Sequence, residues 1–147
     1  MNESDFLLKN ATMVDGTVID VEVRDTRISK MGTDIASELR VIDAKNMLLL
    51  PGLVDLHTHL REPGRENSET VLSGSQSAIK GGYTAVSAMA NTSPVADTAG
   101  VVEQVARLGK EAGLCDVFPI GAVTVGLKGE QLAELTAMAQ GTGRSAP

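Results

Sequence analysis

Aromatic residues and cysteine are scarce in this chain of 147 residues. It has no tryptophan, one tyrosine, two phenylalanines and one cysteine. The core therefore has to be built from aliphatic side chains, and Cys115 cannot form an internal disulfide, which fits the reducing cytoplasm. No apolar run approaches the ~20 residues of a membrane span, and residues 1–10 lack the pattern of a secretory signal. We expect a cytoplasmic protein with no membrane segment and with Cys115 as a buried structural thiol.

Positive charge is also in short supply. The chain has 13 lysines and arginines against 19 aspartates and glutamates, a net charge of -6. Proteins that bind nucleic acid usually display a basic patch, so we expect no nucleic-acid partner. The length suffices for an ordinary domain but falls short of the ~250 residues of a complete (β/α)8 barrel.

The first fifty residues consist of short apolar runs separated by turn signals. Asp15-Gly16 is typical of a hairpin turn, and Asp25-Thr26 indicates a second tight turn. Apolar and charged residues alternate over 21–24, as in a strand with one face in water, which would expose Glu22. The pattern predicts a small all-β unit over residues 1–51. Its expected strands, beside a further apolar run at 48–50, are Phe6–Lys9, Val18–Val23, Ile28–Met31 and Val41–Ile42.

From residue 52 onwards, strand and helix patterns alternate. Gly81-Gly82 and Gly113 follow two amphipathic stretches, where glycine suits a left-handed helix end. The order strand, helix, strand, helix, strand, helix indicates parallel β/α units over 52–139, and residues 140–147, without an apolar period, predict a loose tail. The expected elements are strands at Leu53–His59, Thr84–Ala90 and Val117–Val123, and helices at Glu69–Lys80, Asp97–Ala112 and Glu130–Ala139.

The strongest chemical signal is the run from Asp55 to His59, which reads DLHTH. Residues two apart in a strand point to the same side, so His57 and His59 project together with Asp55. Two imidazoles at this spacing can donate to one divalent metal ion. In the alternative interpretation they are two ordinary histidines, one packed and one exposed. Asp55 either orients a histidine or caps a loop, and Glu62 either braces the following loop or lies in solvent.

The longer string PGLVDLHTHLREPG, residues 51–64, resembles the signature of dihydroorotases, which belong to the amidohydrolase superfamily. The segments MANTSP at 89–94, GAVT at 121–124 and GLKG at 126–129 are similar to later segments of that family. The resemblance extends to about residue 139 and is strongest to the longer bacterial type. It implies a partial TIM-type (β/α)8 metal-dependent hydrolase barrel, its first three β/α units, preceded by a small all-β unit of composite or half-sandwich type.

The resemblance also implies roles for four residues. His57 and His59 would be ligands of a zinc site that is binuclear in the complete family. Arg61 and Asn91 would bind the substrate, because a guanidinium can hold the ring carboxylate of dihydroorotate through two parallel hydrogen bonds. Hydantoins and dihydropyrimidines lack that carboxylate. In the alternative interpretation, Arg61 is a solvated surface residue and Asn91 a turn former. The implied reaction interconverts N-carbamoyl-L-aspartate and (S)-dihydroorotate in de novo pyrimidine (UMP) biosynthesis.

The chain lacks part of what this chemistry needs. It has two histidines, whereas a catalytic zinc normally takes three protein ligands and keeps one open position. The resemblance implies that further ligands and the general acid/base aspartate follow residue 147. Residues 140–147 also lack the aspartate expected there, so we expect a truncation or frame change near Gln140 and a fragment that is inactive alone.

The alternatives are another cyclic amidohydrolase, similar to dihydropyrimidinase or allantoinase, or a non-catalytic homologue that serves as a scaffold. The expected partners are the small-molecule substrate and either a second copy of the chain or an aspartate transcarbamoylase.

Overall fold

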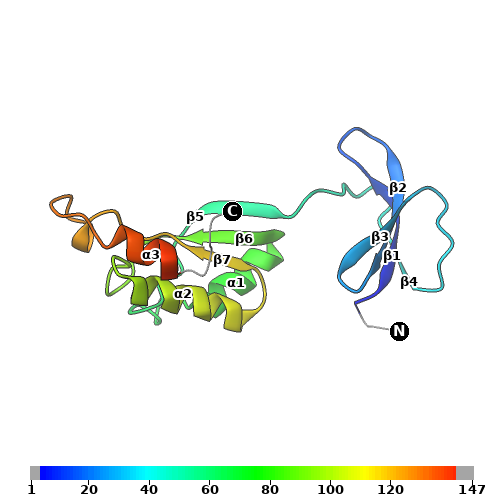
Figure 1. Cartoon of the computed structure of the whole chain (residues 1–147). Coiled ribbons are helices and arrows are strands. Elements are labelled where there is room, and N and C mark those ends of the chain that lie inside the picture. Colours follow the sequence, from blue (N-terminus) through cyan, green and yellow to red (C-terminus); the bar gives the residue numbers. More distant parts are fainter. Residues whose placement is uncertain (1–3, 142–147) are drawn as a thin grey trace. The chain divides into compact units, whose positions relative to one another are not determined.

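The chain divides into two compact units, Met1–Pro51 and Gly52–Pro147, seen in a computed structural model that describes residues 4–141 (Figure 1). The first unit contains only strands. The second contains strands that alternate with helices. The mixed α/β class expected from the sequence is confirmed. No helix within residues 4–141 has the length and apolar character needed to cross a bilayer.

The N-terminal unit is a four-stranded sheet with the order β3-β2-β1-β4. Antiparallel hairpins join β1 to β2 and β2 to β3, whereas β4 pairs with β1 in parallel. Both predicted turns are confirmed: Met13 N–H donates to Thr17 O at 2.8 Å around Gly16, and Asp25 and Thr26 have φ of 48° and 63°. The run at 48–50 makes one isolated bridge and no strand. The strands span Phe6–Thr12 (β1), Val18–Arg24 (β2), Arg27–Gly32 (β3) and Arg40–Asp43 (β4).

The prediction that Glu22 is exposed to solvent is wrong, since Glu22 is only 1% exposed. Arg24 Nε and Ser29 Oγ each donate to Glu22 Oε1 at 2.9 Å. Hydrogen bonds from Arg24, then Ser37 and Ser29, lower the pKa of Glu22 to about 2. The segment after β3 folds back over this face, where the Ile35 N–H donates to the buried carboxylate of Asp20 at 3.0 Å. The carboxylates of Asp20 and Glu22 are therefore buried and hydrogen-bonded, whereas Arg24 on the same face stays exposed.

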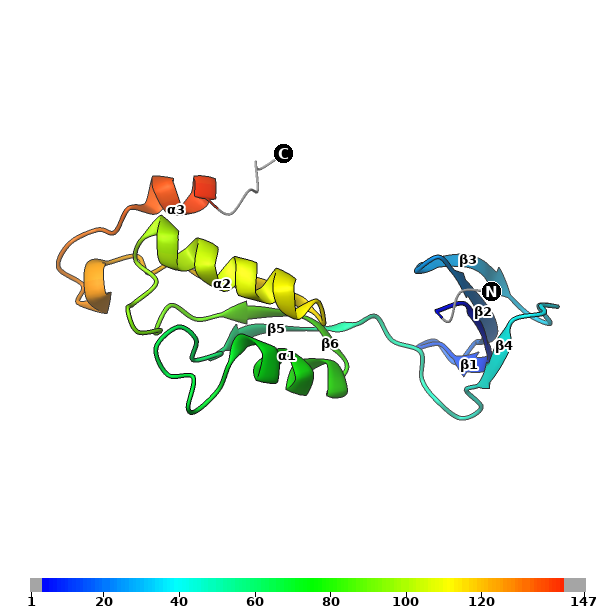
Figure 2. The same ribbon diagram turned by 90° about the horizontal axis from the view of Figure 1, so that it is seen from below.

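The C-terminal unit is built on a parallel sheet with the order β5-β6-β7. Helix α1 packs on β6, helix α2 packs on β7, and the two helices contact each other; both lie below the strands in Figure 1, and Figure 2 views the unit from this side. The core is aliphatic, as expected; Leu60, Val71 and Val86 are among its buried residues. The elements span Leu53–Thr58 (β5), Val71–Lys80 (α1), Tyr83–Ala88 (β6), Ala99–Ala112 (α2), Asp116–Pro119 (β7) and Leu135–Gly141 (α3).

Capping residues flank the first two helices, and at the start of α1 the cap includes a side-chain hydrogen bond. Thr70 is the N-cap of α1, and its hydroxyl accepts the Ser73 N–H at 3.0 Å, so α1 begins two residues later than predicted. Thr98 is the N-cap of α2. The predicted left-handed glycines after both helices are confirmed at Gly82, with φ of 83°, and at Gly113, with φ of 62°.

The third β/α unit differs from its prediction at both elements. Strand β7 ends at Pro119 rather than at residue 123, because the neighbouring strand β6 ends at Ala88. The last hydrogen bond between the two strands runs from the Ile120 N–H to the Ala88 carbonyl at 2.8 Å. The predicted helix from residue 130 begins only at Leu135. Its first residues lie in a loop in which Ala133 N–H donates to Val123 O at 3.0 Å.

The predicted tail at 140–147 is wrong at its first two residues, which continue α3. Residues 142–147 of that predicted tail lie outside the described part of the chain.

Candidate metal and substrate site

Strand β5 carries His57 near its end, and His59 follows it directly. The two imidazole ring centroids are 5.1 Å apart, with an angle of 68° between the ring planes, and both residues are exposed. Two imidazoles bound to one zinc ion at ~2.0–2.1 Å per nitrogen have centroids at most about 6.4 Å apart. The observed separation fits a shared ion, so the residues present are suited to hold one.

Asp55 acts on the backbone of this strand rather than on a ring. Its Oδ1 accepts the His57 N–H at 3.0 Å. The register between β5 and β6 shifts between Asp55 and Thr58, so the ladder is interrupted where this N–H lies. The carboxylate thus satisfies this N–H and fixes the backbone from which His57 projects.

Asn91 meets His59 at the same end of the sheet. It follows β6 as His59 follows β5, and the carboxyl ends of neighbouring parallel strands meet at one edge. Asn91 Oδ1 lies 2.9 Å from His59 Nδ1. The structure therefore brings together three of the four predicted site residues, and the contact of Asn91 is with a predicted metal ligand.

Arg61 lies in the loop that follows β5, half-buried and with φ of 63°. Within residues 4–141, no hydrogen bond or ion pair occupies its guanidinium group. The next residue anchors the loop, because Glu62 Oε2 accepts the Val71 N–H at 2.8 Å at the start of α1. Of the two interpretations of Glu62, the brace is thus the correct one.

The loops after β5 and β6 are locked to each other. Ser93 N–H donates to Pro63 O at 2.9 Å, and Gly64 lies directly against the Ser93 backbone. Gly64 N–H also donates to Glu66 Oε1 at 2.7 Å, and this bond lowers the pKa of Glu66 below its usual value. The segment that presents Arg61 and the segment that presents Asn91 therefore form one packed structure.

A third anchor at this end of the sheet was not predicted from the sequence. Asp97 Oδ2 accepts the Gly126 N–H at 2.7 Å and ties the start of the α2 segment to the loop after β7. Gly126 and Gly129, both with positive φ, are the sequence signal that indicates a turn there. Within the described residues, no group of three or more histidine, cysteine, aspartate or glutamate side chains can hold a metal ion.

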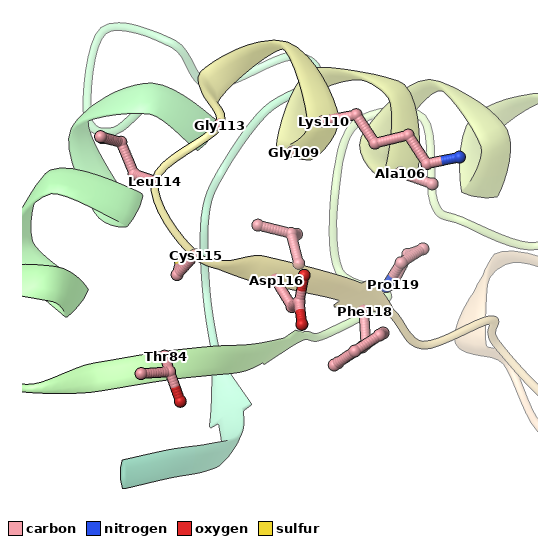
Figure 3. A pocket seen from close by; sticks show the side chains of 11 residues that line it. Thr84, Ala106, Gly109, Lys110, Gly113, Leu114, Cys115, Asp116, Phe118 and Pro119 are labelled. Carbon is pink, nitrogen blue, oxygen red and sulfur yellow. The ribbon is translucent and has the colours of Figure 1, made fainter. Parts of the chain in front are cut away.

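A cavity of about 800 Å³ lies elsewhere, along the edge strand β7 and beneath α2 (Figure 3). Its lining includes Lys110, Cys115 and Phe118, and none of the four predicted site residues. Cys115 is half-buried, so the prediction of a buried thiol is too strong; it packs against the core on one side and lines the cavity on the other.

Comparison with known proteins identifies the family. The model of the family described as dihydro-orotase-like matches residues 46–144. The chain belongs to the dihydro-orotase-like family. The resemblance seen in the motif at 51–64 is thereby confirmed.

Relatives of this family are similar over nearly the whole chain. Dihydroorotase from Streptomyces coelicolor is 62% identical over 133 residues, which are 90% of this chain and 31% of the relative. Those from Leifsonia xyli subsp. xyli and Mycobacterium tuberculosis are 57% and 54% identical, and the matches cover 98% and 86% of this chain and 33% and 30% of the relatives. The chain thus spans about a third of the length of these dihydroorotases.

Solved structures with the same fold come from other hydrolases. An L-hydantoinase (dihydropyrimidinase) from Arthrobacter aurescens has a TM-score of 0.67 and 28% identity, covering 82% of this chain and 28% of its own. An atrazine chlorohydrolase mutant from Arthrobacter aurescens, solved with zinc and atraton, has a TM-score of 0.59 and 18% identity, covering 88% of this chain and 39% of its own. The second likeness is one of fold alone.

Proposed function

We propose that this chain provides the first metal-binding and carboxylate-binding part of a dihydroorotase. The proposed reaction interconverts N-carbamoyl-L-aspartate and (S)-dihydroorotate in pyrimidine biosynthesis. The observation that carries the proposal is the pair of imidazoles 5.1 Å apart beside Asn91, in a chain 54–62% identical to dihydroorotases. The general acid/base and the other metal ligands would come from the two thirds of the relatives that this chain does not cover.

The proposed roles follow the chemistry of each side chain. His57 and His59 would hold one zinc ion of a binuclear site. A zinc ion in such a site supplies a hydroxide near neutral pH by lowering the pKa of its bound water. Asp55 holds the His57 backbone in place. The guanidinium of Arg61, which has no partner among residues 4–141, would donate two parallel hydrogen bonds to the ring carboxylate, with Asn91 as a second donor.

The exposed apolar side of β5 supports the proposal of an incomplete barrel. Val54 is 56% exposed and Leu56 is 73% exposed, whereas β6 and β7 have α1 and α2 packed on them. In a closed (β/α)8 barrel every strand has a helix outside it. We accordingly propose residues 52–139 as its first three β/α units and 1–51 as a separate β unit. A cytoplasmic location and a second copy or an aspartate transcarbamoylase as partner remain part of the same proposal.

Arg61 favours dihydroorotate over the substrates of hydantoinase-type enzymes, because those ring amides carry no carboxylate. The comparisons agree in direction, since dihydroorotases reach 62% identity and the hydantoinase 28%. An alternative role as a non-catalytic scaffold would leave Arg61 and the imidazole pair without a function.

A chimera tests the proposal. Residues 1–139 of this chain replace the matching third of the Streptomyces coelicolor dihydroorotase, and turnover of dihydroorotate is compared with that of hydantoin and dihydrouracil. We expect turnover of dihydroorotate alone, and its loss in His59→Ala. Arg61→Lys should raise the KM for dihydroorotate about 10- to 150-fold, since one charge-assisted hydrogen bond contributes ~1.5–3 kcal/mol.

Arg65→Lys is the matched control, because Arg65 is an exposed arginine in the same loop and should leave KM unchanged. A folded chimera that hydrolyses hydantoin and ignores dihydroorotate would show that the assignment is wrong. An equal rise in KM for both arginine variants would show that Arg61 has no specific contact with the substrate.

A further inference from the structure

The contact between His59 and Asn91 constrains the proton on the imidazole. Asn91 Oδ1 lies 2.9 Å from His59 Nδ1, and an amide oxygen can only accept a hydrogen bond. For this contact to be a hydrogen bond, the proton of the neutral ring has to reside on Nδ1. The other nitrogen, Nε2, is left with its lone pair available for a metal ion.

We propose that Asn91 is a positioning residue for His59, in addition to its proposed contact with the substrate. The bond to Nδ1 fixes the tautomer and the plane of the ring, so that Nε2 is presented as the metal donor. The same bond fixes the amide of Asn91, whose Nδ2 has no hydrogen-bond partner within residues 4–141. The Asn91 amide thus contacts the metal-binding residue His59 through Oδ1 and offers Nδ2 as a hydrogen-bond donor to an anionic substrate. This inference rests on the proposed function for the identity of that ligand.

Both residues are next to buried residues of the core. Leu60, next to His59, and Ala90, next to Asn91, are each 6% exposed and belong to the two apolar clusters of this unit. The Ala90 carbonyl also accepts the Ala96 N–H at 3.0 Å, which closes the loop that carries Asn91. The contact therefore joins two segments that are anchored in the core, as expected for a group that orients a metal ligand.

The tautomer can be read directly in the metal-free chain. Long-range ¹H–¹⁵N spectra of the labelled chain, recorded at about pH 8.5 where imidazoles are neutral, show which nitrogen carries the proton. We expect the Nδ1–H form for His59, its loss in Asn91→Ala and its retention in Asn91→Asp, whose carboxylate still accepts. His57 serves as an internal reference, and Asn67→Ala, at an exposed asparagine of the loop after β5, is the control variant.

Zinc affinity is the second readout, measured on the same chain by competition with a chromophoric chelator. Loss of such an orienting partner typically weakens metal binding 10- to 100-fold, so we expect about a tenfold weaker affinity in Asn91→Ala. Asn91→Asp and Asn67→Ala should bind zinc at least as tightly as the original chain. In the chimera, Asn91→Asp should still lose affinity for dihydroorotate, because two carboxylates repel each other.

An Nε2–H tautomer in the original chain would overturn the proposal, as would an unchanged tautomer and zinc affinity in Asn91→Ala. The spectra need neither metal nor substrate. A chimera without dihydroorotase activity would therefore contradict the proposed function while leaving this inference standing.

Discussion

The packing of the two loops at the carboxyl end of the sheet predicts a large penalty for Gly64→Ala. Gly64 has φ of +95°, and a Cβ there would collide with the Ser93 carbonyl oxygen and lie 2.6 Å from the Ser93 Cβ. The left-handed conformation costs a non-glycine residue ~1–2 kcal/mol, and overpacking costs a further ~1–3 kcal/mol. We expect the free energy of unfolding of the C-terminal unit to fall by about 2–5 kcal/mol.

Gly82→Ala separates the two costs. Gly82 has φ of +83° in the same unit, but a Cβ there would meet no atom within 4 Å. Its loss should be only the conformational ~1–2 kcal/mol. Urea unfolding of both variants, followed by circular dichroism, measures the difference, which is the contribution of the contact between the loops. Resonances of His59 should shift in Gly64→Ala and stay unchanged in Gly82→Ala.

Equal losses of stability in the two variants would refute the argument, because they would leave no penalty for the contact with Ser93. So would a Gly64→Ala variant with unshifted His59 resonances, since the loops would then not hold the site together.

Two further predictions concern other parts of the chain. Glu22 has a folded pKa of about 2 against an ordinary value of 4.5, so its contribution to the stability of the N-terminal unit is complete above pH 4.5 and is lost as the pH falls towards 2. The free energy of unfolding, plotted against pH over this range, should therefore have a smaller slope in Glu22→Gln. A slope equal to that of the original chain would contradict this. The chain should self-associate through the exposed apolar side of β5, which sedimentation velocity can detect. Leu56→Ser, which replaces a 73% exposed side chain, should reduce the association. A monomeric original chain would contradict the prediction that this side of the sheet is uncovered.

The order of the elements could be predicted from the sequence because strand and helix periods are local properties. Burial and strand length could not, because they depend on distant segments. Glu22 alternates with valines, as a solvent-exposed residue of a strand would. The chain after β3 nevertheless folds back over Glu22 and supplies Ser37 as a hydrogen-bond partner of its carboxylate. Strand β7 could continue through apolar residues past Pro119, but the neighbouring strand has already ended at Ala88.

The candidate site divides in the same way. The pair of His57 and His59 was visible because a spacing of two places side chains on one side of a strand. The bond from His59 to Asn91 crosses 32 positions of sequence and depends on the rotamers of both side chains. The anchor from Glu62 to the α1 N-terminus likewise depends on where the helix begins, which is set by Thr70.

The anchors of this site have a consequence for what the chain can do by itself. The hydrogen bonds that hold the segments of His59 and Asn91 lie within residues 52–96: the β5–β6 ladder, the bond from Ser93 to Pro63, and the bond from Val71 to Glu62. None of them requires a closed barrel, so the two imidazoles can be organised for a metal ion in this chain alone. The proton transfer of the proposed reaction needs a group that none of these contacts provides. Metal binding and turnover should therefore separate here, the first present in the isolated chain and the second only when the remaining strands are supplied.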